Sequence, residues 1–354
     1  MDKDYLWDRS GEADPEIEKL ENVLGRLRYN RAAAVFPEIP VRVRKSILAR
    51  LFQVPWAPAA AVALLVIIIA AVGWLVRPKQ VALGPAWNVT KIAGTPRLES
   101  KPIHANGGTA KLGLGQTLET DSQSRANIQL DEIGTVEVEP GTRLRVVRMN
   151  SELKRLALER GTIHASIWAP PGQFVVDTPS AVAVDLGCAY TLHVDDSGDG
   201  LLRTTLGWVG FKLGNREAFI PAGAACRTKP KVGPGAPYFE DASESFRTAL
   251  FKLDLEGGSA KERNAELTTV LAHARQHDAL TLWHLLPRVD QSQRSRIYDR
   301  LNALVPAPEG VTREGILRGE SKMLDLWWNQ LGLGDISSWR HWERSWSPEN
   351  GVAK

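Results

Sequence analysis

The chain has little cysteine and little histidine, and both are confined to one part of it. Only Cys188 and Cys226 occur among 354 residues, and none of the seven histidines lies in the first fifty positions. The net charge of +3 is small and evenly spread, which excludes nucleic-acid binding by the chain as a whole. No phosphate-binding loop and no nucleophile elbow occur in the sequence. We therefore expect no enzyme, no catalytic residues, no cofactor and no direct nucleic-acid partner.

Two patterns resemble metal sites without completing one. His273 and His277 are four residues apart on an expected helix, with His284 two turns on, but the residues between them lack the glutamate of a zinc protease. The acidic run Asp195–Gly200 has neither the spacing nor the final glutamate of a calcium loop. We interpret the histidines as solvated helix residues and the acidic run as a hairpin turn. The sequence predicts no metal site.

One long stretch contains no charge and no polar amide. It runs 23 residues, from Val54 to Val76. As a helix it reaches roughly 34 Å, enough to cross a hydrocarbon core of ~30 Å. Trp56 and Trp74 lie near its ends, where indole rings favour the membrane interface. The sequence predicts a transmembrane helix over 54–76, with Trp56 and Trp74 as anchors in the lipid bilayer. Basic residues are slightly more frequent before this helix than after it, which favours a cytoplasmic N-terminus.

The segment before this stretch, residues 1–50, has the pattern of a short amphipathic helix. Asp14 and Pro15 are typical of a helix start. An apolar stripe follows at spacings of three and four, made of Ile17, Leu20, Leu24 and Leu27. A helix this short is marginal in water, so we expect the stripe to pack on something. Two interpretations stay open: self-association or membrane-surface contact, and docking of a cytoplasmic partner.

Residues 84–228 change to a period of two. Apolar residues alternate with polar ones in short runs, as in Ile163, Ala165 and Ile167, and glycine or proline turns separate the runs at intervals of about ten residues. No helical pattern lies between them. The sequence therefore predicts an antiparallel all-β domain over 84–228.

Four pieces of this segment stand in a recognisable order after the apolar stretch: Leu156–Ile163, Phe174–Pro179, Gly207–Val209 and Pro221–Gly223. Over about 105–228 they resemble the FecR domain, the periplasmic part of membrane-bound regulators of extracytoplasmic-function sigma factors. Cys188 and Tyr190 depart from the family's Gly-Thr-x-Phe signature. The zinc-binding histidine and cysteine of many anti-sigma domains are also absent from residues 1–50. The resemblance implies a regulator that works by binding.

The two cysteines would then lie in an oxidising periplasm, where two lone cysteines in one β domain are disulfide candidates. Closing the 38-residue loop between Cys188 and Cys226 would stabilise the fold by roughly 3–4 kcal/mol in the chain-entropy model. The alternative is a pair of buried free thiols.

Helical spacing replaces the alternation after residue 241. Apolar stripes over 241–335, ended by prolines, predict a helical module of paired helices. A tryptophan-rich tail over 336–354 follows. The final 28 residues hold five tryptophans: Trp327, Trp328, Trp339, Trp342 and Trp346. They either seal the module's own core or form an exposed surface for an unknown periplasmic protein or a glycan.

Together these patterns predict a multidomain membrane protein. Its expected parts are a short N-terminal helical segment, one transmembrane helix, an antiparallel all-β domain of the FecR type and a C-terminal all-α module. The resemblance implies a single-pass protein of the bacterial inner membrane, with its N-terminus in the cytoplasm and its C-terminal domains in the periplasm. It also implies that the N-terminal segment binds an extracytoplasmic-function sigma factor. The alternative is a structural or envelope-assembly protein, anchored by the same helix, whose β domain docks other periplasmic components.

Overall fold

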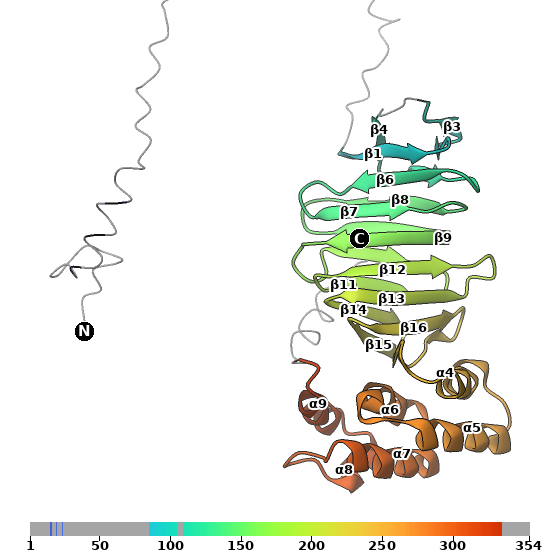
Figure 1. Cartoon of the computed structure of the whole chain (residues 1–354), viewed down its shortest axis with the longest axis vertical. Helices are drawn as coiled ribbons and strands as arrows, with labels where there is room; N and C mark the ends of the chain where they lie inside the picture. Colours follow the sequence, from blue (N-terminus) through green and yellow to red (C-terminus); the bar gives the residue numbers. More distant parts are fainter. Residues whose placement is uncertain (1–14, 16–18, 20–22, 24–84, 105–108, 335–354) are drawn as a thin grey trace, which may run out of the picture. The chain divides into compact units, whose positions relative to one another are not determined.

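The computed structural model describes residues 85–104 and 109–334, together with the single positions 15, 19 and 23. The two long ranges belong to one compact unit, Lys79–Lys354. In that unit the strands come first along the chain, and the helices follow at one end of the stack of strands (Figure 1).

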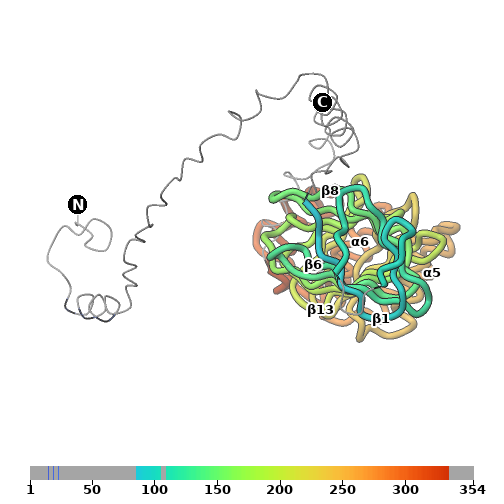
Figure 2. The backbone as a smooth tube through the Cα atoms, turned by 90° about the horizontal axis from the view of Figure 1, so that it is seen from above, coloured from blue at the N-terminus to red at the C-terminus, as the bar shows by residue number. Residues whose placement is uncertain are grey.

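The strands form two facing sheets, and one long strand belongs to both. The first sheet has the order β4 (Thr109–Gly113), β1 (Ala86–Ala93), β6 (Arg125–Gln129), β7 (Gly134–Val138), β9 (Lys154–Ile167), β12 (Ala189–Val194), β13 (Gly200–Leu206) and β16 (Ala224–Lys229), with β17 (Gly233–Pro234) and β18 (Tyr238–Phe239) both beside β16. The second has the order β3 (Lys101–Pro102), β2 (Arg97–Leu98), β5 (Thr117–Glu119), β8 (Arg143–Met149), β9, β10 (Phe174–Asp177), β11 (Val182–Asp185), β14 (Trp208–Leu213) and β15 (Arg216–Pro221). In Figure 2, which looks down the stack, β8 of the second sheet lies opposite β1 and β13 of the first.

The alternation in the sequence explains why the sheets face each other. In β7 the side chains of Val136 and Val138 are fully buried, whereas those of Thr135 and Glu137 point outward and are half-exposed. Successive side chains of a strand point to opposite faces, so each sheet turns one apolar face inward. Fully burying a valine or leucine contributes roughly 1.5–3 kcal/mol, and both inner faces join one continuous core.

Strand β9 passes from one sheet to the other at Gly161. Before it, the buried residues are Leu156 and Leu158; after it they are Ile163, Ala165 and Ile167. The buried positions thus change from even to odd numbers, as a bulge requires when one extra residue enters a strand. Gly161 has φ +94°, and a Cβ there would lie 2.3 Å from the Cα of Thr142. Glycine is therefore the residue that this passage requires.

Six α-helices are described after the strands, joined by short π- and 3₁₀-helical turns. They are α4 (Glu244–Phe251), α5 (Ala260–His273), α6 (Ala279–Leu285), α7 (Gln291–Leu304), α8 (Arg313–Arg318) and α9 (Ser321–Gln330). The turns between them are η2 (Lys252–Glu256), η3 (Gln276–Asp278) and η4 (Leu286–Arg288). Side-chain caps begin several helices: Ser259 and Glu262 form a reciprocal capping box at α5, and Asp290 caps α7.

Aromatic side chains join the helices to the β unit. Phe219 of β15 meets Trp328 of α9 with ring centroids 5.4 Å apart, and Trp283 of α6 meets Trp328 at 4.8 Å. Trp327 and Trp328 are fully buried or nearly so, so these two tryptophans belong to the core. The remaining tryptophans of the tail, in 336–354, lie outside the described residues.

The predicted fold class needs a correction on the membrane helix. Within 85–104 and 109–334, no helix is both long enough and apolar enough to cross a bilayer. The architecture that the structure does show is a two-sheet β unit with helices against one end. The predicted span over 54–76, with Trp56 and Trp74, lies outside the described residues.

The expectation of a purely antiparallel β domain is also wrong in detail. Strands β9 and β10 run parallel, with Val176 paired to Leu156. The pattern predicted separate strands on either side of Gly161, whereas β9 is one strand of 14 residues. The second error has a physical cause: a bulge that carries a strand from sheet to sheet looks, in sequence, like a turn.

Candidate binding surface at the rim of the sandwich

Two exposed apolar side chains lie at one rim of the β unit. Trp168 follows the end of β9 and is 68 % exposed, and Leu206 ends β13 and is 53 % exposed. Ala189 of β12 pairs with Ser166 on one side and with Leu206 on the other, so the ends of β9 and β13 lie at the same rim. We call Trp168 and Leu206, with the turn between β11 and β12, the apolar rim.

Backbone hydrogen bonds fix this rim. The N–H of Ile167 donates to the Cys188 carbonyl at 2.9 Å, and the Trp168 N–H donates to the Ile133 carbonyl at 2.7 Å. Gly207 has φ +69°, and a Cβ there would lie 2.1 Å from the carbonyl oxygen of Gly187. The two turns therefore touch through their backbones, which gives the exposed side chains a rigid base.

A buried carboxyl lies beneath the rim. Asp185 is 1 % exposed. One of its oxygens accepts the Gly187 N–H at 2.8 Å, and the other accepts the Cys188 thiol at 2.6 Å. Burial raises the pKa of Asp185 to about 7, against the smaller opposing effect of these hydrogen bonds.

The neighbouring thiol and phenol are held neutral. Burial, with Asp185 beside them, raises the pKa of Cys188 and that of Tyr190 well above their usual ranges. The Tyr190 hydroxyl is buried and has no hydrogen-bond partner among the described residues. Because the thiolate is the reactive form of cysteine, Cys188 is placed as a structural residue and not as a nucleophile.

The predicted disulfide does not form in the structure, where both cysteines are free and buried. Cys226 of β16 pairs with Leu202, and Leu202 pairs with Leu192. Cys188 precedes β12 by one residue and is four residues from Leu192, so the cysteines are offset by roughly 13 Å along the strands and about 10 Å across them. A disulfide needs Cα atoms within about 7 Å. The Cys226 thiol instead donates to the Gly235 carbonyl at 3.2 Å.

The other chemical patterns noted in the sequence are dispersed. The ring of His277 stacks on Phe239 with centroids 3.4 Å apart, and His273 hydrogen-bonds the Thr269 carbonyl one turn back. The interpretation of the histidines as solvated is wrong for His284, which is 1 % exposed and buried among aromatic rings. In the acidic run, one Asp195 oxygen accepts the backbone N–H groups of Ser197 and Asp199, which forms the hairpin turn between β12 and β13. Within 85–104 and 109–334, no group of three potential ligand residues could hold a metal ion.

The predicted docking stripe lies outside the described residues, since Ile17, Leu20, Leu24 and Leu27 are not among them. The neighbouring positions Pro15, Lys19 and Val23 are helical and exposed, with Val23 64 % exposed. The apolar rim was not predicted from the sequence, although one signal was present. Trp168 continues the outward positions of β9 (Thr162, His164 and Ser166) and comes directly before Ala169 and two prolines.

The region that contains the rim matches a known protein family. Residues 116–206 match the family described as FecR protein. No curated protein matches the chain. Two crystal structures of a candidate anti-sigma factor from Parabacteroides distasonis, at 1.65 and 2.50 Å resolution, are each similar to it at 16 % identity and a TM-score of 0.32. The similarity covers 38 % of this chain and 64 % of theirs, so the chain spans less than two thirds of those proteins. Values this low do not establish a shared fold.

The resemblance to FecR proteins is thus confirmed over residues 116–206.

Proposed function

We propose that this chain is a regulator of the FecR type, acting by binding and not by catalysis, and that it couples a partner of its β unit to a cytoplasmic sigma factor. The observation that carries the proposal is the FecR match over 116–206, which contains the whole apolar rim. An exposed tryptophan beside an exposed leucine, on a backbone held by close turns, suits a binding surface. The buried Asp185 and Cys188 beneath it suit a structural support for this surface.

The two ends of this coupling have different partners. Residues 1–50 would hold an extracytoplasmic-function sigma factor through the stripe that includes Leu20 and Leu24. The apolar rim would meet a periplasmic protein or a glycan. The proposal places the chain at the bacterial inner membrane with the β unit on the periplasmic side, and it rests for this on the charge pattern and on the FecR resemblance.

The sigma-factor arm is tested by co-purification with the full chain. Leu20→Asp combined with Leu24→Asp should abolish recovery of the sigma factor, because each buried leucine contributes roughly 1.5–3 kcal/mol to the contact. Lys19→Asp combined with Asn22→Asp is the control, because it adds two aspartates to the side of the expected helix opposite the stripe. Failure of the unmodified chain to recover any sigma factor from its native organism would refute this arm and leave the envelope-assembly alternative.

The rim arm is tested by a transcriptional reporter for the same sigma factor in the native organism. Trp168→Ser combined with Leu206→Ser should change reporter output. Ile92 and Leu114 are 51 % and 62 % exposed and lie outside the FecR match, so serine at both positions removes comparable apolar surface elsewhere. Equal output from both double variants would show that the rim has no special role.

The compartment is tested independently. A periplasmic reporter enzyme fused after Lys354 should be active, and a fluorophore that matures only in the cytoplasm should be dark at the same point. The reverse pattern would place the β unit in the cytoplasm and contradict the proposed coupling.

A further inference from the structure

A buried ion-pair network joins the β unit to the helices. The Asp254 side chain is 4 % exposed and lies between Arg216 of β15 and Arg288 of η4. Its Oδ2 accepts from Arg288 Nη1 at 2.9 Å and from the Ala236 N–H at 2.6 Å, and its Oδ1 accepts from Arg216 Nη2. Other donors of the two arginines reach backbone carbonyls, among them those of Pro234 and Glu217.

A cavity of about 300 Å³ opens beside the network, among η2, α5, η4 and α7. Its charged lining consists of three arginines and two aspartates: Arg216, Arg263, Arg288, Asp254 and Asp290. The lining therefore carries one excess positive charge. This volume is at the small end of the range for small-molecule sites, roughly 300–1,000 Å³.

One nitrogen atom of these arginines lacks a hydrogen-bond partner among the described residues. The Nε atom of Arg263, on α5, is buried and has no hydrogen-bond partner within the described part of the chain. The nearby carboxylate of Asp290 is the cap of α7, where one of its oxygens, Oδ1, accepts the Gln293 N–H at 3.0 Å and the Ser292 hydroxyl at 2.7 Å. A buried guanidinium N–H without an acceptor is unfavourable, since these donors are almost always paired.

We propose that this cavity binds a small oxyanion, a carboxylate or a phosphate group, through the guanidinium of Arg263. Arginine presents two parallel N–H groups that match the paired oxygens of either group. The excess positive charge favours an anion over a neutral ligand. This site lies where the helices meet strand β15, and it is independent of the apolar rim and of the sigma-factor arm.

The test is titration calorimetry of the full chain, in low salt, with inorganic phosphate, citrate and acetate as separate probes. The unmodified chain should bind at least one of them. Arg263→Gln should weaken that binding by at least tenfold. Arg263→Lys, which keeps the charge but loses the paired donors, should fall between the two. Which probe binds most tightly decides between phosphate and carboxylate.

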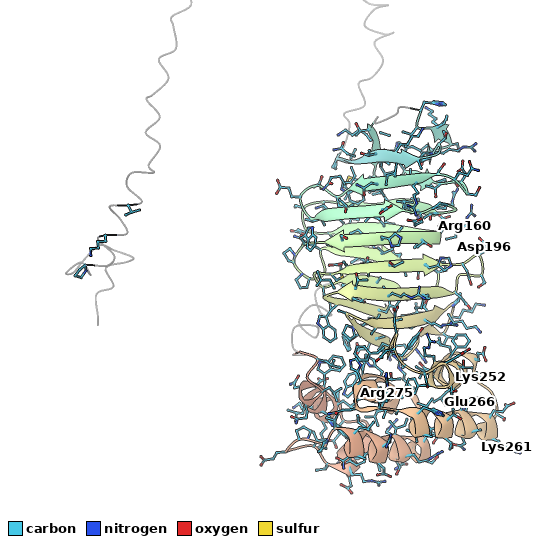
Figure 3. The ribbon with its side chains drawn as sticks, in the orientation of Figure 1. Arg160, Asp196, Lys252, Lys261, Glu266 and Arg275 are labelled. Carbon is cyan, nitrogen blue, oxygen red and sulfur yellow. The ribbon has the colours of Figure 1, made fainter. Side chains whose placement is uncertain are left out.

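Lys261→Gln is the matched control, since it removes one positive charge from the same helix at an exposed position outside the cavity lining. Figure 3 shows the Lys261 side chain at the outer end of α5, pointing away from the strands. Binding should be unchanged in this variant, and circular dichroism should show native helix content in all three variants. Absence of binding by every probe, or equal weakening in Arg263→Gln and Lys261→Gln, would overturn the proposal.

Discussion

The backbone N–H of Phe219 donates a hydrogen bond to Nε2 of His284 at 3.0 Å, which joins strand β15 to helix α6. The other ring nitrogen, Nδ1, lies 2.8 Å from the Leu280 carbonyl. An N–H group can only donate and a carbonyl can only accept, so the contacts define one tautomer: His284 is neutral, with its proton on Nδ1. The histidine is thus a structural connector between the two parts of the unit.

Removing this connector should destabilise the unit. His284→Ala leaves the Phe219 N–H buried without its acceptor and opens a cavity among the aromatic rings, so we expect a loss of about 2–4 kcal/mol in the free energy of unfolding. His273→Ala, at an exposed position of α5, should change it by less than about 0.5 kcal/mol. Urea unfolding curves of both variants test this, and equal losses would contradict the structural role.

Stability should depend on pH through Asp185. Burial raises the pKa of its carboxyl to about 7 in the folded chain, above the ordinary value of 3.8 expected when unfolded. The folded state therefore binds this proton more tightly. The resulting stabilisation is fully present below about pH 4 and is lost as the pH rises through 7, roughly 4 kcal/mol in all.

The Asp185→Asn variant isolates this dependence. An amide cannot ionise and has nearly the same shape, so the fall in melting temperature between about pH 5 and pH 8 should become shallower. Asp196→Asn, at an exposed position, should keep the original slope. Figure 3 labels Asp196 at one edge of the strands, next to Arg160, where Val194 at the end of β12 pairs with Gly161 in the middle of β9. Thermal unfolding followed by circular dichroism across that range provides the measurement, and a retained slope in Asp185→Asn would assign the dependence to other groups.

The passage of β9 between the sheets should not tolerate a side chain. Gly161→Ala places a Cβ against Thr142 at a positive φ, so both the clash and the backbone strain act, and we expect a loss of more than about 3 kcal/mol. Gly141→Ala is the comparison, since its φ is also positive, at +73°, but its Cβ meets no atom within 4 Å. It should lose only about 1 kcal/mol. Similar losses at both positions would show that close packing at Gly161 is unimportant.

The thiols should be free and protected. Cys188 is 1 % exposed and Cys226 is fully buried. Alkylation of the native chain without reductant should therefore be slow, and denaturation should release two reactive thiols per chain. Mass spectrometry of alkylated peptides tests this. An intact Cys188–Cys226 linkage after non-reducing denaturation would contradict the strand register.

The inward residues of the strands could be predicted because alternation is local: Ile163, Ala165 and Ile167 are recognisable from their spacing alone. The pairing of strands could not, since β10 lies parallel to β9 only after the chain has turned at Pro170 and Pro171. The burial of Asp185 depends on neighbours from β12 and β14, which no local pattern reveals. The cavity at Arg263 was even less predictable from the sequence, because its lining brings together residues from position 216 to position 293.

The shared strand also has a mechanical consequence. Since one continuous backbone crosses from the second sheet to the first at Gly161, the two layers cannot slide past each other without stretching covalent bonds or breaking several ladders of hydrogen bonds together. A force applied to Trp168, at the end of that strand, is therefore carried along one backbone into both layers. Pulling at this rim would therefore distribute the force over both sheets instead of separating one strand from its neighbours.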